Sequence, residues 1–200
     1  LPLPPYILKS RDYQDSDTTD YQTIFAKNKG AIAAPTASLH FDEKLLKKIV
    51  QKKINYSFVT LHVGPGTFFP IRAKKITDHR MHSENGQISE KAAYAINSSK
   101  ENGGRIIPVG TTALRLIESA CDEYGFLRTF DGSTDIFIKP GYSFKISNGL
   151  ITNFHFPNST LFLLIVAFLG LKETHRIYNH AINQKYRFYS YGDGSLLIRK

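Results

Sequence analysis

The stretch from Arg105 to Glu123, RIIPVGTTALRLIESACDE, decides the fold class. Its mostly apolar beginning predicts a short buried strand from Arg105 to Val109, which ends at the turn Gly110-Thr111-Thr112. Apolar residues then recur at helical spacing and predict a helix from Ala113 to Glu123, whose first free N–H groups Thr111 or Thr112 can cap. Strand, turn and helix therefore follow one another within one short segment.

The same alternation continues in both directions along the chain. Further helices are predicted from about Phe41 to Lys53, from Ser89 to Lys100, after Ser159 and from about Glu173 to Tyr186, and extended segments over Phe58–Val63, Ile136–Ile138 and Phe144–Ile146. The last two flank Lys139-Pro140-Gly141-Tyr142 and are expected to form a hairpin-like pair. The pattern predicts an α+β fold, α/β-like in its alternation, with a mixed sheet and flanking helices.

The first five residues read Leu-Pro-Leu-Pro-Pro, which favours an extended, polyproline-like conformation over a helix. We interpret residues 1–8 as a proline-rich lead-in from an upstream domain that this chain lacks. Leu1 is not an initiator methionine, which suggests a part of a longer chain.

Composition limits the class of protein. The chain has 200 residues, of which 42% are hydrophobic, and this is enough to bury a full core. Its longest apolar run, Leu161 to Leu169, has about half the length that a bilayer-spanning helix needs, so we expect a cytoplasmic protein without membrane contact. The single cysteine, Cys121, excludes an intramolecular disulfide and a Cys-based zinc cage. A net charge of +9 is large enough to attract polyanions, although charge alone names no partner.

Two glycine-rich turns follow predicted strands, at Val63–Phe68 and at Val109–Thr112. Glycine lets a ligand approach the backbone, a following helix offers free N–H groups to an anion, and threonine hydroxyls can bond ribose or carboxylate. Neither turn continues as the Gly-Lys-Ser/Thr of a phosphate loop. Taken singly, a turn of this kind is more often a plain tight turn than a ligand site.

Histidines provide a second signal. His79 and His82 lie close to Glu84 in the sequence, His40 and His155 stand beside aromatic residues, and His62 lies two residues before Gly64. A metal site would need three converging ligands, and we expect none here. General acid or base chemistry is the more natural use, because histidine titrates near neutrality and a carboxylate can fix its tautomer. The alternative for each histidine is a structural role.

The carboxyl-terminal third is basic and aromatic. Residues 171–200 hold six Lys or Arg against two Asp or Glu, and Tyr186 to Asp193 interleaves aromatic residues with Arg187. Such a segment suits stacking on an unpaired base beside a phosphate, as in single-strand RNA recognition. The alternative is a strand that faces the core.

Taken in chain order, a series of short motifs resembles the S-adenosylmethionine:tRNA ribosyltransferase-isomerase family of queuosine biosynthesis. The motifs are Ala33–Phe41, His62–Phe68, His82-Ser83-Glu84, Gly103-Gly104-Arg105, Val109–Thr112, Ile136–Ile138, Pro140–Tyr142, Leu150–His155, Pro157–Leu161 and Tyr191-Gly192-Asp193. The resemblance covers essentially the whole chain, but family members are longer. Residues 1–200 resemble the carboxyl-terminal part of the main catalytic domain of a two-domain enzyme, whose β-barrel domain is absent from this chain.

The resemblance implies a reaction. The ribosyl moiety of S-adenosylmethionine is transferred to 7-aminomethyl-7-deazaguanine in tRNA and isomerised, which gives epoxyqueuosine-tRNA and releases adenine and methionine. It also implies S-adenosylmethionine as co-substrate with no further cofactor, tRNA with the modified wobble base as partner, and a monomer at full length. Two alternatives stay open: a non-catalytic RNA-binding remnant of that enzyme, and a generic nucleotide-binding domain.

The resemblance also suggests which residues act. Proton transfer is expected from His40, His82 and Glu84. Substrate binding is expected from Gly64, Gly66, Thr67, Arg72, Gly110, Thr111, Thr112, Arg115, Asn153, His155 and Asp193. RNA binding is expected from Arg176, Lys185, Arg187 and Tyr191.

Overall fold

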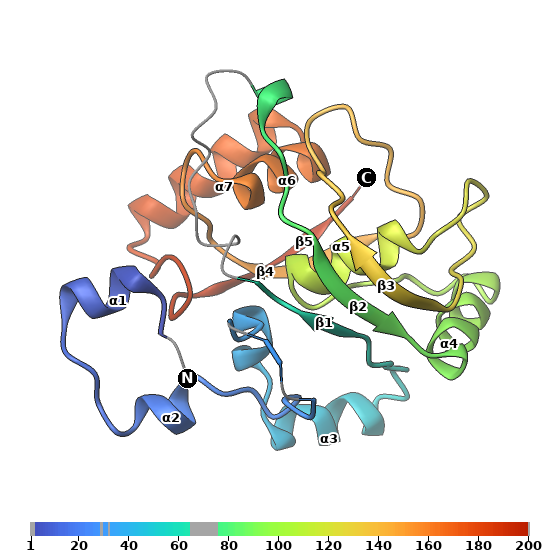
Figure 1. The fold of residues 1–200 in the computed structure, drawn as a ribbon, viewed down its shortest axis with the longest axis horizontal. Helices are drawn as coiled ribbons and strands as arrows, with labels where there is room; N and C mark the ends of the chain where they lie inside the picture. The colour runs from blue at the N-terminus through green and yellow to red at the C-terminus, as the bar shows by residue number, and fades with distance from the viewer. Residues whose placement is uncertain (1–2, 29, 32, 65–75, 200) are drawn as a thin grey trace.

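The computed structural model describes residues 3–28, 30–31, 33–64 and 76–199 (Figure 1). Its helices are α1 (Pro5–Ser10), α2 (Asp17–Asp20), α3 (Glu43–Gln51), α4 (Glu90–Glu101), α5 (Thr111–Ser119), α6 (Thr160–Leu169) and α7 (Leu171–Asn183), with short 3₁₀ turns η1 (Thr36–His40) and η3 (Ile76–Asp78). Its strands are β1 (Thr60–His62), β2 (Glu84–Ile88), β3 (Phe130–Thr134), β4 (Gly149–Asn153) and β5 (Gly194–Ile198). The predicted α+β class is confirmed.

The strands form two small antiparallel sheets. One has the order β1-β2-β3, with Leu61 opposite Gly86 and Gly86 opposite Gly132, and the other pairs β4 with β5. A Cβ on Gly86 would lie 2.6 Å from a methyl carbon of Leu116, so this glycine lets α5 pack directly on the three-stranded sheet. Parallel pairing between described residues comes from a single bridge, Val109 with Ile151.

Helix α5 separates two cores. Its Leu116 and Ile117 pack with Ile88 of β2 and with α4, whereas its Leu114 packs with α6, β4 and β5. Figure 1 shows α5 between the two sheets, with α6 and α7 on one side and α4 on the other. The start of α5 is therefore held in place from both sides.

The expected strand from Arg105 to Val109 does not form, and only the parallel bridge between Val109 and Ile151 remains of it. Ile106 exchanges hydrogen bonds with Asn148, and the carbonyl of Pro108 accepts from the N–H of Ile151. Pro108 has no N–H of its own to continue a ladder, which explains why the segment follows β4 without becoming a strand.

The expected cap of α5 is wrong in detail. Gly110 occupies the N-cap position at φ 92°, and within the described part of the chain neither Thr111 nor Thr112 caps the helix. A positive φ of this size is strained for any residue with a Cβ, so glycine is required here. Among the described residues, no side chain accepts from the first N–H groups of α5, so they are available to a ligand.

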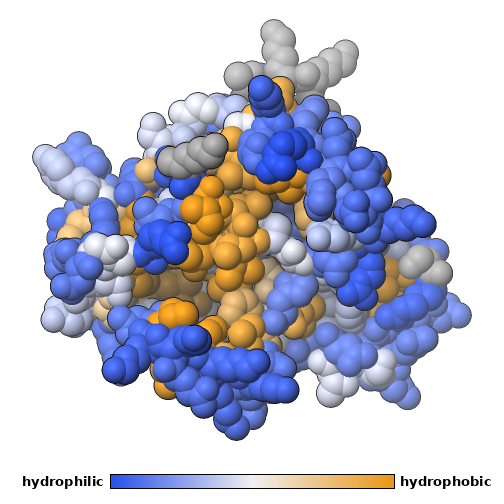
Figure 2. Space-filling model, turned by 180° about the vertical axis from the view of Figure 1, so that it is seen from behind, coloured by the Kyte–Doolittle hydropathy of each residue, from blue (hydrophilic) through white to orange (hydrophobic). Residues whose placement is uncertain are grey.

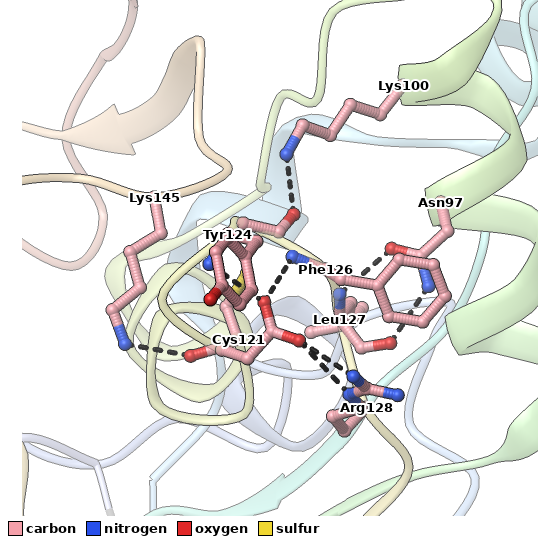
Figure 3. A network of polar contacts seen from close by, with 10 residues as sticks. Asn97, Lys100, Cys121, Tyr124, Phe126, Leu127, Arg128 and Lys145 are labelled. Carbon is pink, nitrogen blue, oxygen red and sulfur yellow. Dashed lines mark hydrogen bonds and ion pairs between the residues drawn. The ribbon is translucent and has the colours of Figure 1, made fainter.

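Helix α5 also ends before Glu123, at Ser119. A compact loop over residues 121–128 takes over, in which Asp122 accepts hydrogen bonds from the N–H groups of Tyr124 and Phe126 and pairs with Arg128 (Figure 3). Asn97 of α4 bonds both the N–H and the carbonyl of Leu127. These side-chain bonds satisfy the loop backbone and stop the helix.

The expected hairpin over residues 136–146 is wrong. Ile138 and Ile146 are buried, but the described segment forms no strand. Its backbone instead bonds to the buried carboxylate of Glu118, which accepts from the N–H groups of Lys145, Ile146 and Ser147. A side chain of α5 thus takes the place of a partner strand.

The proline-rich start is helical from Pro5 onward rather than extended. Proline is tolerated there because the first helical residue needs no N–H partner. Leu3 and Ile7 are buried against Tyr21, so this segment packs into the described fold.

Three predicted helices are confirmed, and the structure shows a side-chain cap at the start of each. Asp42, Ser89 and Ser159 each accept a hydrogen bond from an N–H three residues ahead, at the starts of α3, α4 and α6. Helix α7 ends at Asn183 rather than Tyr186. None of the described helices has the length and apolarity required to cross a membrane. Figure 2 shows apolar side chains gathered in a hollow on the face opposite to that of Figure 1.

Candidate active site

Several segments that are distant in the sequence enclose a cavity of about 380 Å³. It is lined by Tyr6 and Lys9 of α1, residues 33–37, Val63, Gly110, Thr111 and Thr112, residues 152–157, Ser159, Leu161, Tyr189 and Ser190. The uncapped start of α5 is part of this wall. A cavity with mainly apolar walls and a few polar groups beside a helix N-terminus suits a small ligand with a negatively charged end.

Asn153, at the end of β4, connects the walls of the cavity. Its Nδ2 donates to the carbonyls of Tyr189 and Gly192, each at 3.1 Å, and lies 3.3 Å from Nε2 of His40. Its Oδ1 lies 3.5 Å from the hydroxyl of Thr36. One buried amide therefore fixes η1 and the 189–192 turn against β4.

His155 lies at the cavity with both ends of the residue anchored. Its Nε2 is 2.8 Å from the hydroxyl of Thr152, and its backbone N–H donates to the Tyr178 hydroxyl at 3.0 Å. Burial lowers the pKa of the imidazole to about 4, so His155 is neutral at pH 7. A neutral ring can accept a proton or a hydrogen bond from a ligand.

Glu84 and Arg115 form a buried ion pair. Nη1 of Arg115 lies 2.6 Å from Oε2 of Glu84, and the other carboxylate oxygen accepts from the N–H of Gly64 at 3.3 Å. Among the described residues, Nη2 of Arg115 is buried without a hydrogen-bond partner. Arg115 is one helical turn after Thr111, so the ion pair lies behind the start of α5.

The three residues expected to transfer protons lie in different places. His40 is exposed, touches Asn153 and contributes to a lowered pKa of Asp193, which is mainly due to the hydrogen bond from Arg187. Glu84 belongs to the ion pair with Arg115, and His82 is exposed two residues before Glu84. Metal binding receives no support within the described ranges, where no group of three His, Cys, Asp or Glu side chains is placed to hold an ion.

The predicted substrate-binding residues fall into three sets. Gly110, Thr111, Thr112, Asn153 and His155 line the cavity. Gly64, Arg115 and Asp193 are not lining residues: Gly64 and Arg115 bond Glu84, and Asp193 pairs with Arg187. Gly66, Thr67 and Arg72 lie outside the described residues.

The predicted RNA-binding side chains are largely engaged within the protein. Arg176 pairs with Glu173, and Arg187 pairs with Asp193. The Tyr191 hydroxyl donates to Asp17, a buried carboxylate whose pKa is lowered chiefly by Arg11. Lys185 is exposed, at φ 58° just after α7.

Sequence patterns missed several residues of the cavity wall. The Tyr6 hydroxyl accepts from the N–H of Ser190 at 2.7 Å, and the ring of Tyr189 stacks on Phe156 at 3.4 Å between centroids. Tyr6 and Ser190 come from opposite ends of the chain, and no local pattern signals their meeting. The resemblance did contain part of this wall, through its Leu150–His155 and Pro157–Leu161 motifs.

The chain is similar to curated proteins from several bacteria. A protein of Ruegeria sp. named S-adenosylmethionine:tRNA ribosyltransferase-isomerase is 54% identical over 198 residues, which cover 99% of this chain and 57% of that protein. A protein of the same name from Zymomonas mobilis is 56% identical, over 100% of this chain and 58% of that protein. The chain therefore spans little more than half the length of these relatives.

A solved structure shares the fold. The crystal structure of S-adenosylmethionine tRNA ribosyltransferase from Thermotoga maritima aligns with a TM-score of 0.66 at 34% identity, over 82% of this chain and 51% of that one. A family model described as "Queuosine biosynthesis protein" matches residues 1–197. With nearly its whole length matched, this chain belongs to the queuosine biosynthesis protein family.

Proposed function

We propose that this chain carries the S-adenosylmethionine site of a tRNA ribosyltransferase-isomerase, which makes epoxyqueuosine in tRNA and releases adenine and methionine. One observation carries the proposal: five residues predicted to bind substrate, Gly110, Thr111, Thr112, Asn153 and His155, line one cavity. The names of the relatives from Ruegeria and Zymomonas support the class of reaction.

Within this proposal, the start of α5 receives the carboxylate of the methionyl group. Gly110 leaves the first N–H groups of the helix uncapped, and the Thr111 and Thr112 hydroxyls are within the same wall. A helix N-terminus stabilises a negative charge. The apolar remainder of the wall suits the adenine ring.

The chemistry needs an acid and a base. The positive sulfonium acidifies the 5′ carbon, from which a base removes a proton, and an acid assists the departure of adenine. The amine of the tRNA base then attacks the opened sugar, and methionine is expelled. We assign proton transfer to His40, His82 and Glu84. His40 contacts Asn153 of the cavity wall, while neutral His155 accepts a hydrogen bond from the substrate. No metal or further cofactor enters this scheme.

The proposal is tested by binding and by turnover. Isothermal titration should show S-adenosylmethionine binding that Thr112→Val weakens by about 1 kcal/mol, roughly fivefold, and that exposed Thr129→Val leaves unchanged. Adenine release is then measured with tRNA that carries the modified base, for this chain alone and together with the part of the relatives that it does not span. Binding without adenine release in either case would favour the non-catalytic RNA-binding alternative.

A further inference from the structure

The positive charges of the molecule differ in whether a carboxylate already neutralises them. Every ion pair that the structure shows between two described residues is made by an arginine, including the pairs of Arg176 and Arg187. No described lysine belongs to one of these ion pairs. Five lysines, Lys44, Lys47, Lys48, Lys52 and Lys53, lie on or just after α3, and none has an ion pair or side-chain hydrogen bond to another described residue.

Helix α3 presents its lysines to solvent. Leu46 and Ile49 are half-buried and mark the inner face, whereas Lys47 and Lys48, three and four residues after Lys44, lie with it on the opposite face. Lys44 and Lys52 are eight positions apart, or about 12 Å of helix rise. The outer face of α3 therefore offers a row of free cations.

Exposed aromatic rings accompany this row. After α3 the chain turns back, with Lys53 at φ 55° and the N–H of Ile54 bonded to the carbonyl of Ile49. Tyr56 and Phe58 follow, 52% and 58% exposed. The ring of Phe25 lies 5.7 Å from that of Phe58 and 5.8 Å from that of Phe41, so these rings connect the segments just before and just after α3.

Helix α3 follows one wall of the cavity in the chain. Residues 33–37 form part of the cavity wall, and η1 leads from them through Asp42 directly into α3. In Figure 1, α3 lies at the lower edge of the molecule, whereas α7, which carries paired Arg176, lies at the upper left. Free lysines with adjacent exposed rings match the chemistry of unpaired RNA, which offers phosphates and stacking faces.

We infer that the α3 surface, defined as Lys44, Lys47, Lys48, Lys52, Lys53, Tyr56 and Phe58, binds single-stranded RNA next to the nucleotide that enters the cavity. The inference rests on the proposed function and names the RNA-contacting surface for it.

The test is a binding titration of the 200-residue chain with a fluorescent RNA hairpin that has an unpaired loop, over a series of salt concentrations. The combined Lys44→Gln, Lys47→Gln and Lys48→Gln variant should flatten the log–log salt slope by about 2 to 3, because three phosphate contacts are lost. The matched control, Lys91→Gln, Arg105→Gln and Lys172→Gln, removes the same charge from exposed side chains elsewhere and should keep the slope. Lys→Arg at the three α3 positions should also keep it.

Tyr56→Ala should weaken RNA binding about 5- to 150-fold with the slope unchanged, while Tyr94→Ala, at an even more exposed position on α4, should have no effect. Circular dichroism verifies that each variant is folded. Absence of RNA binding by the wild-type chain, equal losses in the matched control, or binding of anionic lipid vesicles in place of RNA would each overturn the inference. Adenine release and S-adenosylmethionine binding are measured separately. If the α3 lysine variant weakens RNA binding but the chain neither binds S-adenosylmethionine nor releases adenine, the proposed function is refuted and the RNA-binding surface is retained.

Discussion

Nη1 of Arg115 and Oε2 of Glu84 are 2.6 Å apart in a setting where both side chains are almost fully buried. The pair connects α5 to the start of β2, and the same carboxylate accepts from the N–H of Gly64. Two charges removed from water in this way depend on each other, because either one left alone would be buried without compensation.

Glu84→Gln is therefore expected to destabilise the protein by about 3 to 5 kcal/mol, the usual effect of breaking a buried ion pair. The free energy of unfolding in urea measures it. Glu90→Gln, at an exposed position in the first turn of α4, should change that free energy by less than about 0.5 kcal/mol. An equally small effect at Glu84 would mean that the ion pair is open to solvent.

Helices were predictable because their signals are local, although the cap expected for α5 was wrong. Ser159 stands immediately before an apolar run, and its hydroxyl needs only the N–H of Phe162, three residues ahead, to start α6. The segment 136–146 was predicted as a hairpin because its apolar residues and its Pro-Gly turn are also local signals. The carboxylate that organises it comes from Glu118, 27 positions before Lys145, and no local pattern shows this.

In the candidate site, too, residues in local motifs were predictable and contacts between distant segments were not. Gly110 and Asn153 belong to motifs that can be recognised in the sequence, and both reach the cavity. The bond between Tyr6 and Ser190 spans 184 positions and exists only once α1 has packed on the rest of the fold. The engagement of Arg187 by Asp193 was equally hidden, because charge counting treats an arginine as free.

Ser159→Ala should cost about 1 kcal/mol of stability, since the α6 cap is lost. Ser159 also lines the cavity, so S-adenosylmethionine affinity should fall with it. Ser89→Ala removes the equivalent cap of α4, away from the cavity lining, and should cost similar stability while ligand affinity stays constant. Thermal unfolding and titration calorimetry on both variants provide the comparison, which fails if Ser89→Ala weakens ligand binding equally.

His155 predicts a stability change with pH. Burial lowers its pKa to about 4, below the ordinary 6.5, so between these values the unfolded chain binds the proton and the folded chain does not. Stability should therefore be insensitive to this group above pH 6.5 and fall as pH drops toward 4, by about 3 kcal/mol in total. Urea unfolding of the wild type and of His155→Gln over this range isolates the effect, because other titrating groups are common to both. Parallel curves would show that His155 titrates normally.

Arg187 provides the sharpest contrast between the carboxyl-terminal segment and the α3 surface as RNA contacts. Its guanidinium is 3.0 Å from Asp193 and its N–H bonds the same carboxylate, so the charge is already balanced where a phosphate would bind. One lost phosphate contact flattens the log–log salt slope of RNA binding by about 0.7 or more, and we expect Arg187→Ala to flatten it by less than that. Asp193→Asn, which releases the cation, should steepen the slope. If Arg187→Ala flattens it by a full 0.7 to 0.9 instead, Arg187 exchanges Asp193 for a phosphate on binding, and the carboxyl-terminal segment contacts the RNA together with α3.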